Sequence, residues 1–600
     1  MHSRNRRNRP LFAIGLSLLL LLNLGLRLAL ADHGLPHLQI GDENSDLSTA
    51  LRLTKGELPQ WNVRYHRSLI AYVDASATAS LLGFELISGN VRNLQDFQDL
   101  YFTDRWLFTL ATRILMGLLT TAAVLFVGLT GRYLSELAGF SAALCLATNS
   151  FFLINSLFAL PDGLVFFSVA LFLWLTARMM HLKRATDYFF AGAGLALVML
   201  SKFSASVVAV GLIAAHLTIT RHETGALDAR FWRRLVFDRR LVALGAGVFL
   251  GNIFFNPLGF IYPRDLIREF NHMTSYAYSP EANLLAQFEI IRTHLREIVP
   301  LIWRWMLPFS LIGIAAALRY AKQSVYWVVL FSFLALLITI GRVNTQFYKP
   351  FYWTPWLIPT SLLSGFGVQF LFSVISRKRR AIIIPALAAV LLLEGRFLIH
   401  IASIFRRPDT RELALAFVEQ YIPAGTPIIS GQPLAYSVPI QRNDTSIRRA
   451  SELEGRMLDS WQWQLQHPDT ARTRQLYDLY GPEMQQTIDS FSDMIALIET
   501  ESIDYIIEAD YCYGTEHDPA SNSSIEYPAL NDELRSHLTL LKEINPFTEK
   551  SCLGTIDDRT GLSFNLSALN AQIRTGPIIR IYEVNDGSAP EESDDQEISR

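Results

Sequence analysis

The stretch that decides the fold is 4–31, RNRRNRPLFAIGLSLLLLLNLGLRLALA. The hydrocarbon core of a bilayer is about 30 Å thick and requires about 20 apolar residues in a helix. Leu11–Ala31 satisfies this length and is long for the apolar region of a signal peptide. Because further apolar stretches follow, this stretch predicts a first membrane helix. The basic residues before it indicate a cytoplasmic N-terminus.

Ten more apolar blocks follow, at 106–129, 134–158, 162–181, 187–201, 205–220, 240–260, 298–318, 324–341, 351–375 and 381–402. The length criterion therefore predicts a polytopic α-helical membrane protein with about eleven transmembrane helices. The composition agrees, because 50% of the residues are hydrophobic and only 18% are charged. A single soluble domain is excluded. The net charge of -2 argues against a nucleic-acid partner.

The orientation follows from the basic clusters between the blocks. Alternation from a cytoplasmic N-terminus places the clusters 131–132, 178–184, 221–240, 319–322 and 377–380 in the cytoplasm. This agrees with the positive-inside rule. The C-terminal region is then extracytoplasmic. We expect a multi-pass plasma (inner) membrane protein, or an endoplasmic reticulum protein if the source is eukaryotic.

Two domains are expected. The membrane domain covers 1–404 and includes a first outer loop at 32–105. Residues 405–600 form an extracytoplasmic α/β domain with an acidic, disordered tail. A helix is predicted at 411–421, and strands at 426–430, 503–507 and 577–584. Cys512 and Cys552 could form a disulfide in an oxidising compartment, whereas Cys145 lies in an apolar block.

Ionisable residues in or beside the apolar blocks collect on the predicted outer side. They are Asp42, Glu43, Arg113, Asp162, Lys202, Arg342 and Lys349. Charges at such positions are costly and are functional candidates by default. A structural interpretation exists for several of them. Asp162 is a favourable helix cap, and Lys202 and Lys349 are long enough to reach the interface.

Several short motifs follow one another in a fixed order on this side. They are Asp42-Glu43, Ala50–Gly56, Tyr65–Leu69 in place of a His-Pro-Pro-Leu segment, Arg113, Ala159–Asp162, Gly194–Ala196 with Leu200–Lys202, and Tyr348–Pro355. In this order and spacing the first 400 residues or so resemble the dolichyl-phosphate-mannose–protein mannosyltransferases, glycosyltransferase family 39 of the GT-C superfamily. The segment at Tyr65–Leu69 lacks the two prolines that are usual there.

The resemblance implies a GT-C membrane glycosyltransferase of mannosyltransferase type. Its donor would be a polyprenyl- or dolichyl-phosphate sugar, and its acceptor a hydroxyl of a protein, a lipid or a polysaccharide. Asp42, with Glu43 as second choice, is the expected base. Arg113, Asp162, Lys202, Arg342 and Lys349 are the expected donor-phosphate and substrate residues. Direct attack predicts inversion at the anomeric carbon.

No cofactor is expected, because lysine and arginine can neutralise the phosphate and no metal-ligand spacing occurs. A different class of protein stays open. Intramembrane charges also mark transport pathways, so a transporter or flippase of lipid-linked or small polar substrates is the alternative. The absence of a visible repeat between the halves of the chain favours the glycosyltransferase.

Overall fold

The structure is a computed structural model. It describes residues 9–37, 41–54, 56, 68–225, 227–262, 264, 268, 291–292, 304, 306–319, 324–340, 350–430, 438–455, 457–468, 475–481, 491–512, 537–548, 556, 560–563 and 566–585. The chain divides into two compact units. One comprises Met1–His33 and Asp42–Arg406, and the other Gly34–Gly41 and Arg407–Arg600.

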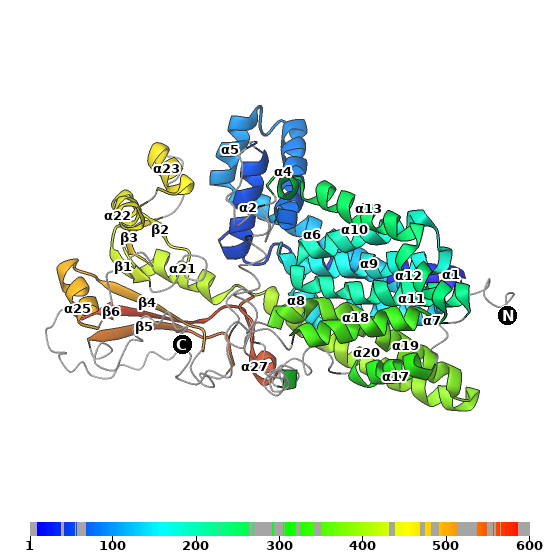
Figure 1. Ribbon diagram of the computed structural model, residues 1–600. Helices are drawn as coiled ribbons and strands as arrows, with labels where there is room; N and C mark the ends of the chain where they lie inside the picture. The colour runs from blue at the N-terminus through cyan, green and yellow to red at the C-terminus, as the bar shows by residue number, and fades with distance from the viewer. Residues whose placement is uncertain are drawn as a thin grey trace. The chain divides into compact units, whose positions relative to one another are not determined.

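The first unit is helical (Figure 1). Its helices are α1 (Arg9–Leu28), α2 (Gly41–Thr54), α4 (Ser68–Ser88), α5 (Leu94–Thr103), α6 (Arg105–Arg132), α7 (Glu136–Ala147), α8 (Ser150–Ile154), α9 (Pro161–Leu182), α10 (Ala185–Ser201), α11 (Ala209–Thr224), α12 (Ala229–Phe237), α13 (Arg239–Phe255), α14 (Pro257–Ile261), α17 (Leu307–Arg319), α18 (Ser324–Ile340), α19 (Thr354–Val374) and α20 (Arg377–Phe405). Two 3₁₀ helices, η2 (Phe203–Val208) and η5 (Pro350–Trp353), precede α11 and α19.

The predicted fold class, a polytopic helical membrane protein with a C-terminal α/β sheet, is confirmed. Within the described residues, seven helical stretches are long and apolar enough to cross a membrane. They are Pro10–Leu28, Leu69–Ser88, Arg105–Arg132, Pro161–Leu182, Phe203–Thr224, Thr354–Val374 and Leu387–Tyr421. Other predicted blocks hold shorter helices. The block at 134–158 is divided into α7 and α8, because the side chain of Asn149 caps a new helix start.

One of these stretches was not among the predicted spans. Leu69–Ser88 in α4 lies within 32–105, which was interpreted as an outer loop, yet it meets the criteria of length and hydropathy. Asp74 and Glu85 interrupt its apolar sequence, and both side chains are buried. The segment 32–105 contains the helices α2, α4 and α5.

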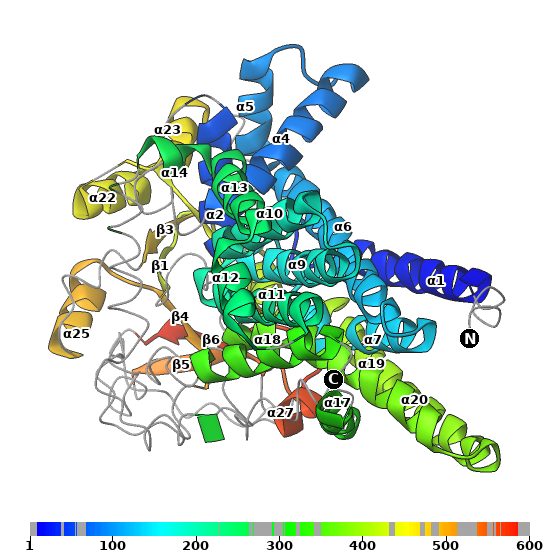
Figure 2. The ribbon, with the colours of Figure 1, turned by 45° about the vertical axis from the view of Figure 1, so that its right-hand side comes forward.

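Helix α9 lies at the centre of the bundle and contacts α6, α10 and α19 (Figure 2). Helices α10 and α13 pack closely because glycines face the neighbouring backbone. A side chain at Gly192 would collide with the carbonyl of Leu244, and one at Gly247 with that of Phe189. Small residues at such crossings allow helices to approach closely where water provides no driving force.

The second unit contains a six-stranded sheet in the order β2-β3-β1-β4-β6-β5. Its elements are α21 (Thr410–Tyr421), β1 (Pro427–Ser430), β2 (Gln441–Arg442), α22 (Asp444–Glu454), α23 (Asp459–Gln466), β3 (Leu476–Tyr480), α25 (Phe491–Thr500), β4 (Tyr505–Asp510), β5 (Leu538–Ile544), α27 (Leu566–Ala571) and β6 (Ile578–Val584). Strands β2, β3, β1 and β4 pair in parallel, and β6 pairs antiparallel with both β4 and β5. The predicted helix at 411–421 and the three predicted strands are confirmed as α21, β1, β4 and β6.

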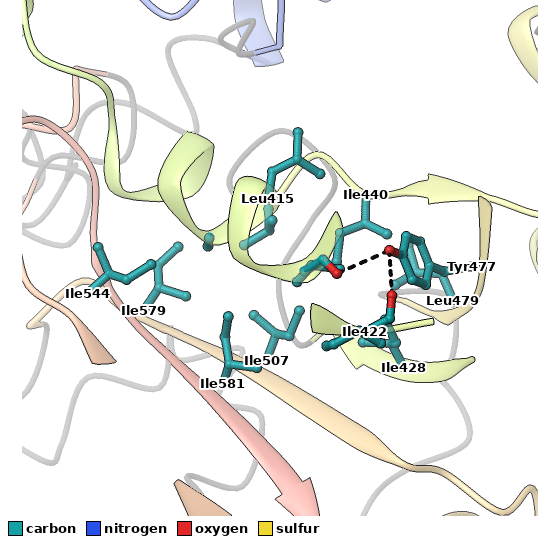
Figure 3. Packing of buried hydrophobic residues seen from close by; sticks show 13 residues of the cluster. Leu415, Ile422, Ile428, Ile440, Tyr477, Leu479, Ile507, Ile544, Ile579 and Ile581 are labelled. Atoms are coloured by element: carbon teal, nitrogen blue, oxygen red, sulfur yellow. Dashed lines mark hydrogen bonds between the residues drawn. The ribbon is translucent and has the colours of Figure 1, made fainter. Parts of the chain in front are cut away.

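The core of this unit lies between α21 and one face of the sheet. Buried isoleucines from β1, β4 and β6 pack against Leu415 of α21 (Figure 3). The buried hydroxyl of Tyr477 in β3 lies 3.2 and 3.1 Å from the carbonyls of Val418 and Ile422, and 2.8 Å from Gln475 Oε1, so these acceptors share its one proton. This hydroxyl therefore joins the end of α21 to the sheet.

The cysteines differ between the units. Cys145, in α7, is a free thiol, whereas Cys512, two residues after the end of β4, is disulfide-bonded. Cys552 lies outside the described residues.

The two outermost strands of the sheet differ in length and regularity. Strand β2 has two residues, and β5 has seven with a bulge between Leu540 and Lys542.

Candidate active site

A buried ion pair joins the first turn of α2 to α6. Arg113 donates through Nε to Glu43 Oε1 at 2.9 Å and through Nη2 to Glu43 Oε2 at 2.8 Å. Both side chains are almost fully buried. The remaining nitrogen of Arg113 donates to the carbonyls of Ala31 and His33 at 3.1 and 2.7 Å, and Phe158 lies 5.0 Å from the guanidinium. Such bidentate geometry is what a buried pair requires to offset the loss of hydration.

Glu43 has a third partner from a distant part of the chain. The backbone N–H of Ala159 donates to Glu43 Oε1 at 2.8 Å. Ala159 lies between α8 and α9, directly before the Leu160-Pro161 start of α9. The carboxylate of Glu43 thus accepts hydrogen bonds from α6 and from the α8–α9 connection. Its neighbour Asp42 is half-buried on the same helical turn.

Asp162, three residues after Ala159, forms a second ion pair, with Lys202. Lys202 Nζ donates to Asp162 Oδ1 at 2.8 Å, and Thr354 Oγ1 donates to the same oxygen at 3.2 Å. The ammonium lies 4.9 Å from the ring centroid of Tyr352. Pro161 starts α9 with a residue preorganised for the first helical position, which places Asp162 in the first turn. Lys202 follows the end of α10.

The two pairs occupy one end of the helical bundle. Ala159 binds Glu43 through its N–H, and Asp162 comes three residues later, in the first turn of α9. The start of α9 therefore links the Glu43–Arg113 pair with the Asp162–Lys202 pair. The predicted site residues Asp42, Glu43, Arg113, Asp162 and Lys202 are placed on these linked elements, whereas Arg342 and Lys349 lie outside the described residues.

Two further carboxylates of this region were not among the predicted site residues. Asp46 of α2 and Asp74 of α4 are buried carboxylates. Asp74 interacts electrostatically with Asp46 and Glu43. An acidic residue in the apolar stretch of α4 was a visible signal for Asp74. The Ala159 N–H belongs to the backbone, and its role leaves no sequence signature. Across the described ranges, no group of three His, Cys, Asp or Glu side chains could hold a metal ion.

Residues 103–232, which contain Arg113, Asp162 and Lys202, match the family model of the dolichyl-phosphate-mannose-protein mannosyltransferases. This match confirms the family resemblance predicted from the motifs. It supports a glycosyltransferase of the membrane as the class of enzyme. No curated protein sequence matches the chain.

Two solved structures are also similar to the chain. ArnT from Cupriavidus metallidurans, bound to undecaprenyl phosphate, is 12% identical with a TM-score of 0.45, and the similarity covers 83% of this chain and 92% of that chain. The oligosaccharyltransferase of Archaeoglobus fulgidus, in complex with Zn and sulfate, is 12% identical with a TM-score of 0.43. That similarity covers 82% of this chain and 68% of that chain.

Proposed function

We propose that the protein transfers a sugar from a polyprenyl- or dolichyl-phosphate donor to an acceptor hydroxyl on the extracytoplasmic side of the membrane, with inversion at the anomeric carbon. The observation that carries the proposal is the linkage of two ion pairs at the start of α9, within the segment that matches the mannosyltransferase family model. Mannose is the first sugar to test because of that family description.

Asp42 is the proposed general base. Glu43 accepts hydrogen bonds from Arg113 and Ala159 and is almost fully buried, so its carboxylate is poorly placed to meet an acceptor. Proton transfer requires a carboxylate that can reach the acceptor hydroxyl. Asp42 is half-buried on the same turn of α2. In this assignment Glu43 and Arg113 position that turn, and Asp42 receives the proton as the hydroxyl attacks.

Lys202 is the proposed partner of the donor phosphate. The leaving phosphate carries negative charge, which fixed cations stabilise most effectively in a site of low dielectric constant. Asp162 and Thr354 hold the end of the Lys202 side chain. Arg342 and Lys349 are proposed as additional cations. These residues supply positive charge without a metal, so the proposed reaction is metal-independent.

The side of the membrane is inferred from two observations. Cys512 is disulfide-bonded, and disulfides persist mainly in oxidising compartments outside the cytosol. The basic clusters of the sequence independently favour a cytoplasmic N-terminus. Both support an extracytoplasmic C-terminal unit in a plasma membrane, or a lumenal one in the endoplasmic reticulum. The proposed acceptor is a protein, lipid or polysaccharide hydroxyl.

The test is sugar transfer by the purified full chain in liposomes. Radiolabelled polyprenyl-phosphate mannose and other polyprenyl-phosphate sugars are supplied with a membrane extract as acceptor. Asp42→Asn is expected to abolish transfer while the protein stays folded, as judged by its thermal unfolding. Asp104→Asn, at an acidic residue between α5 and α6, is the matched control and should stay active.

Two results would contradict the proposal. Full activity of Asp42→Asn would remove the proposed base. Absence of transfer from every donor by folded wild-type protein would favour the transporter or flippase class, which uptake of the same labelled lipids into the liposome lumen would then detect.

A further inference from the structure

A short amphipathic helix connects two helices of the bundle along the chain. Helix α12 (Ala229–Phe237, ARFWRRLVF) connects α11 to α13 (Figure 2). Phe231 is buried, whereas Trp232, Val236 and Phe237 are 59%, 61% and 78% exposed. At 100° per residue, Trp232 and Val236 fall on one flank of the helix. Arg234 falls directly opposite this flank with Arg230 beside it, whereas Arg233 borders the flank next to Val236. All three arginines are exposed.

Helix α12 is fixed at its start and on its inner face. The Asp228 side chain accepts a hydrogen bond from the Phe231 N–H at 2.9 Å and caps the helix. The His216 ring of α11 contacts the Leu235 carbonyl at 3.2 Å, and its other nitrogen contacts the Tyr188 hydroxyl at 3.0 Å. Helix α12 therefore has a defined rotation about its axis.

The connection that follows α12 is also fixed. Arg240 donates to both oxygens of Glu223, at 3.0 and 2.8 Å, and to Asp238, the residue that ends α12. Its guanidinium lies 5.3 Å from the ring of Tyr188. The exposed apolar flank is therefore a stable feature of the helical unit and does not depend on a loosely held loop.

The chemistry of the exposed surface fits a lipid headgroup region. An apolar flank beside arginines is the pattern of helices that lie in the plane of a membrane interface. The segment 221–240 contains six arginines and three carboxylates. Two of these carboxylates, Glu223 and Asp238, are bonded to Arg240. Arg234 also lies 3.9 Å from Glu223. Because the six arginines of the segment outnumber its three carboxylates, the exposed Arg230, Arg233 and Arg234 give α12 a positive surface.

We propose that α12 is an interfacial helix that binds the anionic lipids of one membrane leaflet. Trp232 and Val236 insert at the boundary between headgroups and acyl chains. Arg230, Arg233 and Arg234 bind lipid phosphates. This site lies outside the candidate active site, and its function is to fix the height and rotation of α11 and α13 in the leaflet.

The insertion is tested with a spin label on the full chain in nanodiscs of phosphatidylcholine and phosphatidylglycerol in equal amounts. The label is attached at Val236→Cys or, as the matched control on the opposite face, at Arg234→Cys, both in a Cys145→Ala background. The label at 236 should be accessible to oxygen and protected from a water-soluble nickel reagent. The label at 234 should show the opposite preference. Equal access of the nickel reagent to both labels would overturn the proposal.

The preference for anionic lipid is tested by lipid exchange. Spin-labelled phosphatidylglycerol and phosphatidylcholine are compared on the wild type and on Arg230→Gln/Arg233→Gln/Arg234→Gln. The triple variant should lose phosphatidylglycerol enrichment by about tenfold or more, because each arginine near an anionic surface adds attraction. Arg92→Gln, at an exposed arginine before α5, is the control. An unchanged enrichment in the triple variant, or its full competition by free inorganic phosphate, would contradict lipid binding.

Discussion

Glu43 and Arg113, 70 residues apart in the chain, form a two-point ion pair with both side chains almost fully buried. Because neither charge has ready access to water, each is stabilised mainly by the opposite charge of its partner. Because the Ala159 N–H is bound to the same carboxylate, the pair joins three segments of the helical unit. The two members of the acidic pair after the first span differ in burial: Glu43 is almost fully buried and Asp42 is half-buried.

Breaking the buried pair should be more harmful than removing it. Arg113→Ala leaves Glu43 buried without its partner and is expected to cost about 3–5 kcal/mol of stability. Arg113→Ala combined with Glu43→Gln should recover part of that loss, because the buried charge is gone. The measurement is thermal unfolding in detergent of both single variants and the double variant. If the two single effects simply add, the pair is not coupled and its positioning role fails.

Lys202 should act mainly on the chemical step. Lys202→Met removes the cation proposed to stabilise the leaving phosphate, and kcat should fall about 10²- to 10³-fold. Asp162→Asn keeps the shape but loosens the lysine, with an expected loss of about tenfold to a hundredfold. Lys202→Arg should recover part of the activity. A change in KM alone for Lys202→Met would indicate binding without transition-state stabilisation.

Chelation should leave transfer unchanged. In the proposed reaction, lysine and arginine supply the positive charge near the phosphate, so no divalent ion is needed. Transfer is measured in liposomes before and after treatment with EDTA, and again after Mg²⁺, Mn²⁺ or Zn²⁺ is restored. Loss of activity with EDTA and recovery with one metal would refute the metal-independent reaction.

The crossing of α10 and α13 should tolerate no added side chain. Gly192→Ala places a methyl group against the Leu244 carbonyl, and overpacking of this kind costs about 1–3 kcal/mol. Gly245→Ala in α13 is the matched control, because a side chain there meets nothing within 4 Å. It should be neutral or stabilising, since alanine favours helix. Equal unfolding temperatures for the two variants would show that the crossing is looser than described.

Tyr477→Phe should weaken the α/β unit. It removes the hydrogen bonds to the end of α21 and should cost about 1 kcal/mol. Burial, with a contribution from Glu419, raises the pKa of Tyr477 from 10.0 to about 12. The folded state thus favours the neutral phenol. Its stabilising effect is present below pH 10.0 and is lost as the pH rises through about 12.

Hydrogen exchange of α21 in the wild type and in Tyr477→Phe measures this effect. Protection of α21 should fall in the variant at neutral pH. The difference between the two proteins should disappear at high pH. Equal protection at neutral pH would contradict a stabilising role of the hydroxyl.

The elements predicted from the sequence are those with a strong local signal. Helices α6 and α9 have long apolar runs, and β6 is rich in isoleucine. Helix α4 was placed in a loop because Asp74 and Glu85 dilute its apolar run. Strand β5 was missed because much of it is exposed, so it lacks a buried pattern. Strand β2, with two residues, is too short to leave a pattern.

The charged residues of the candidate site were recognisable individually, but their partners were not. Arg113 stood out because a charge within an apolar span is costly. Its pairing with Glu43 depends on how α2 folds against α6, which no local pattern encodes. The contribution of Ala159 is a backbone N–H that any residue except proline could supply. The catalytic roles of these residues stay predictions until the variants are measured.

The two outermost strands of the α/β sheet have a consequence for solubility. An unpaired strand edge invites another chain to add to it, and proteins reduce this risk with short strands, bulges and lysines. Strand β2 offers only two residues, and β5 has a bulge that ends at Lys542. Both edges are therefore poor templates for strand addition. This unit should resist edge-to-edge aggregation, even when many copies are crowded on one membrane surface.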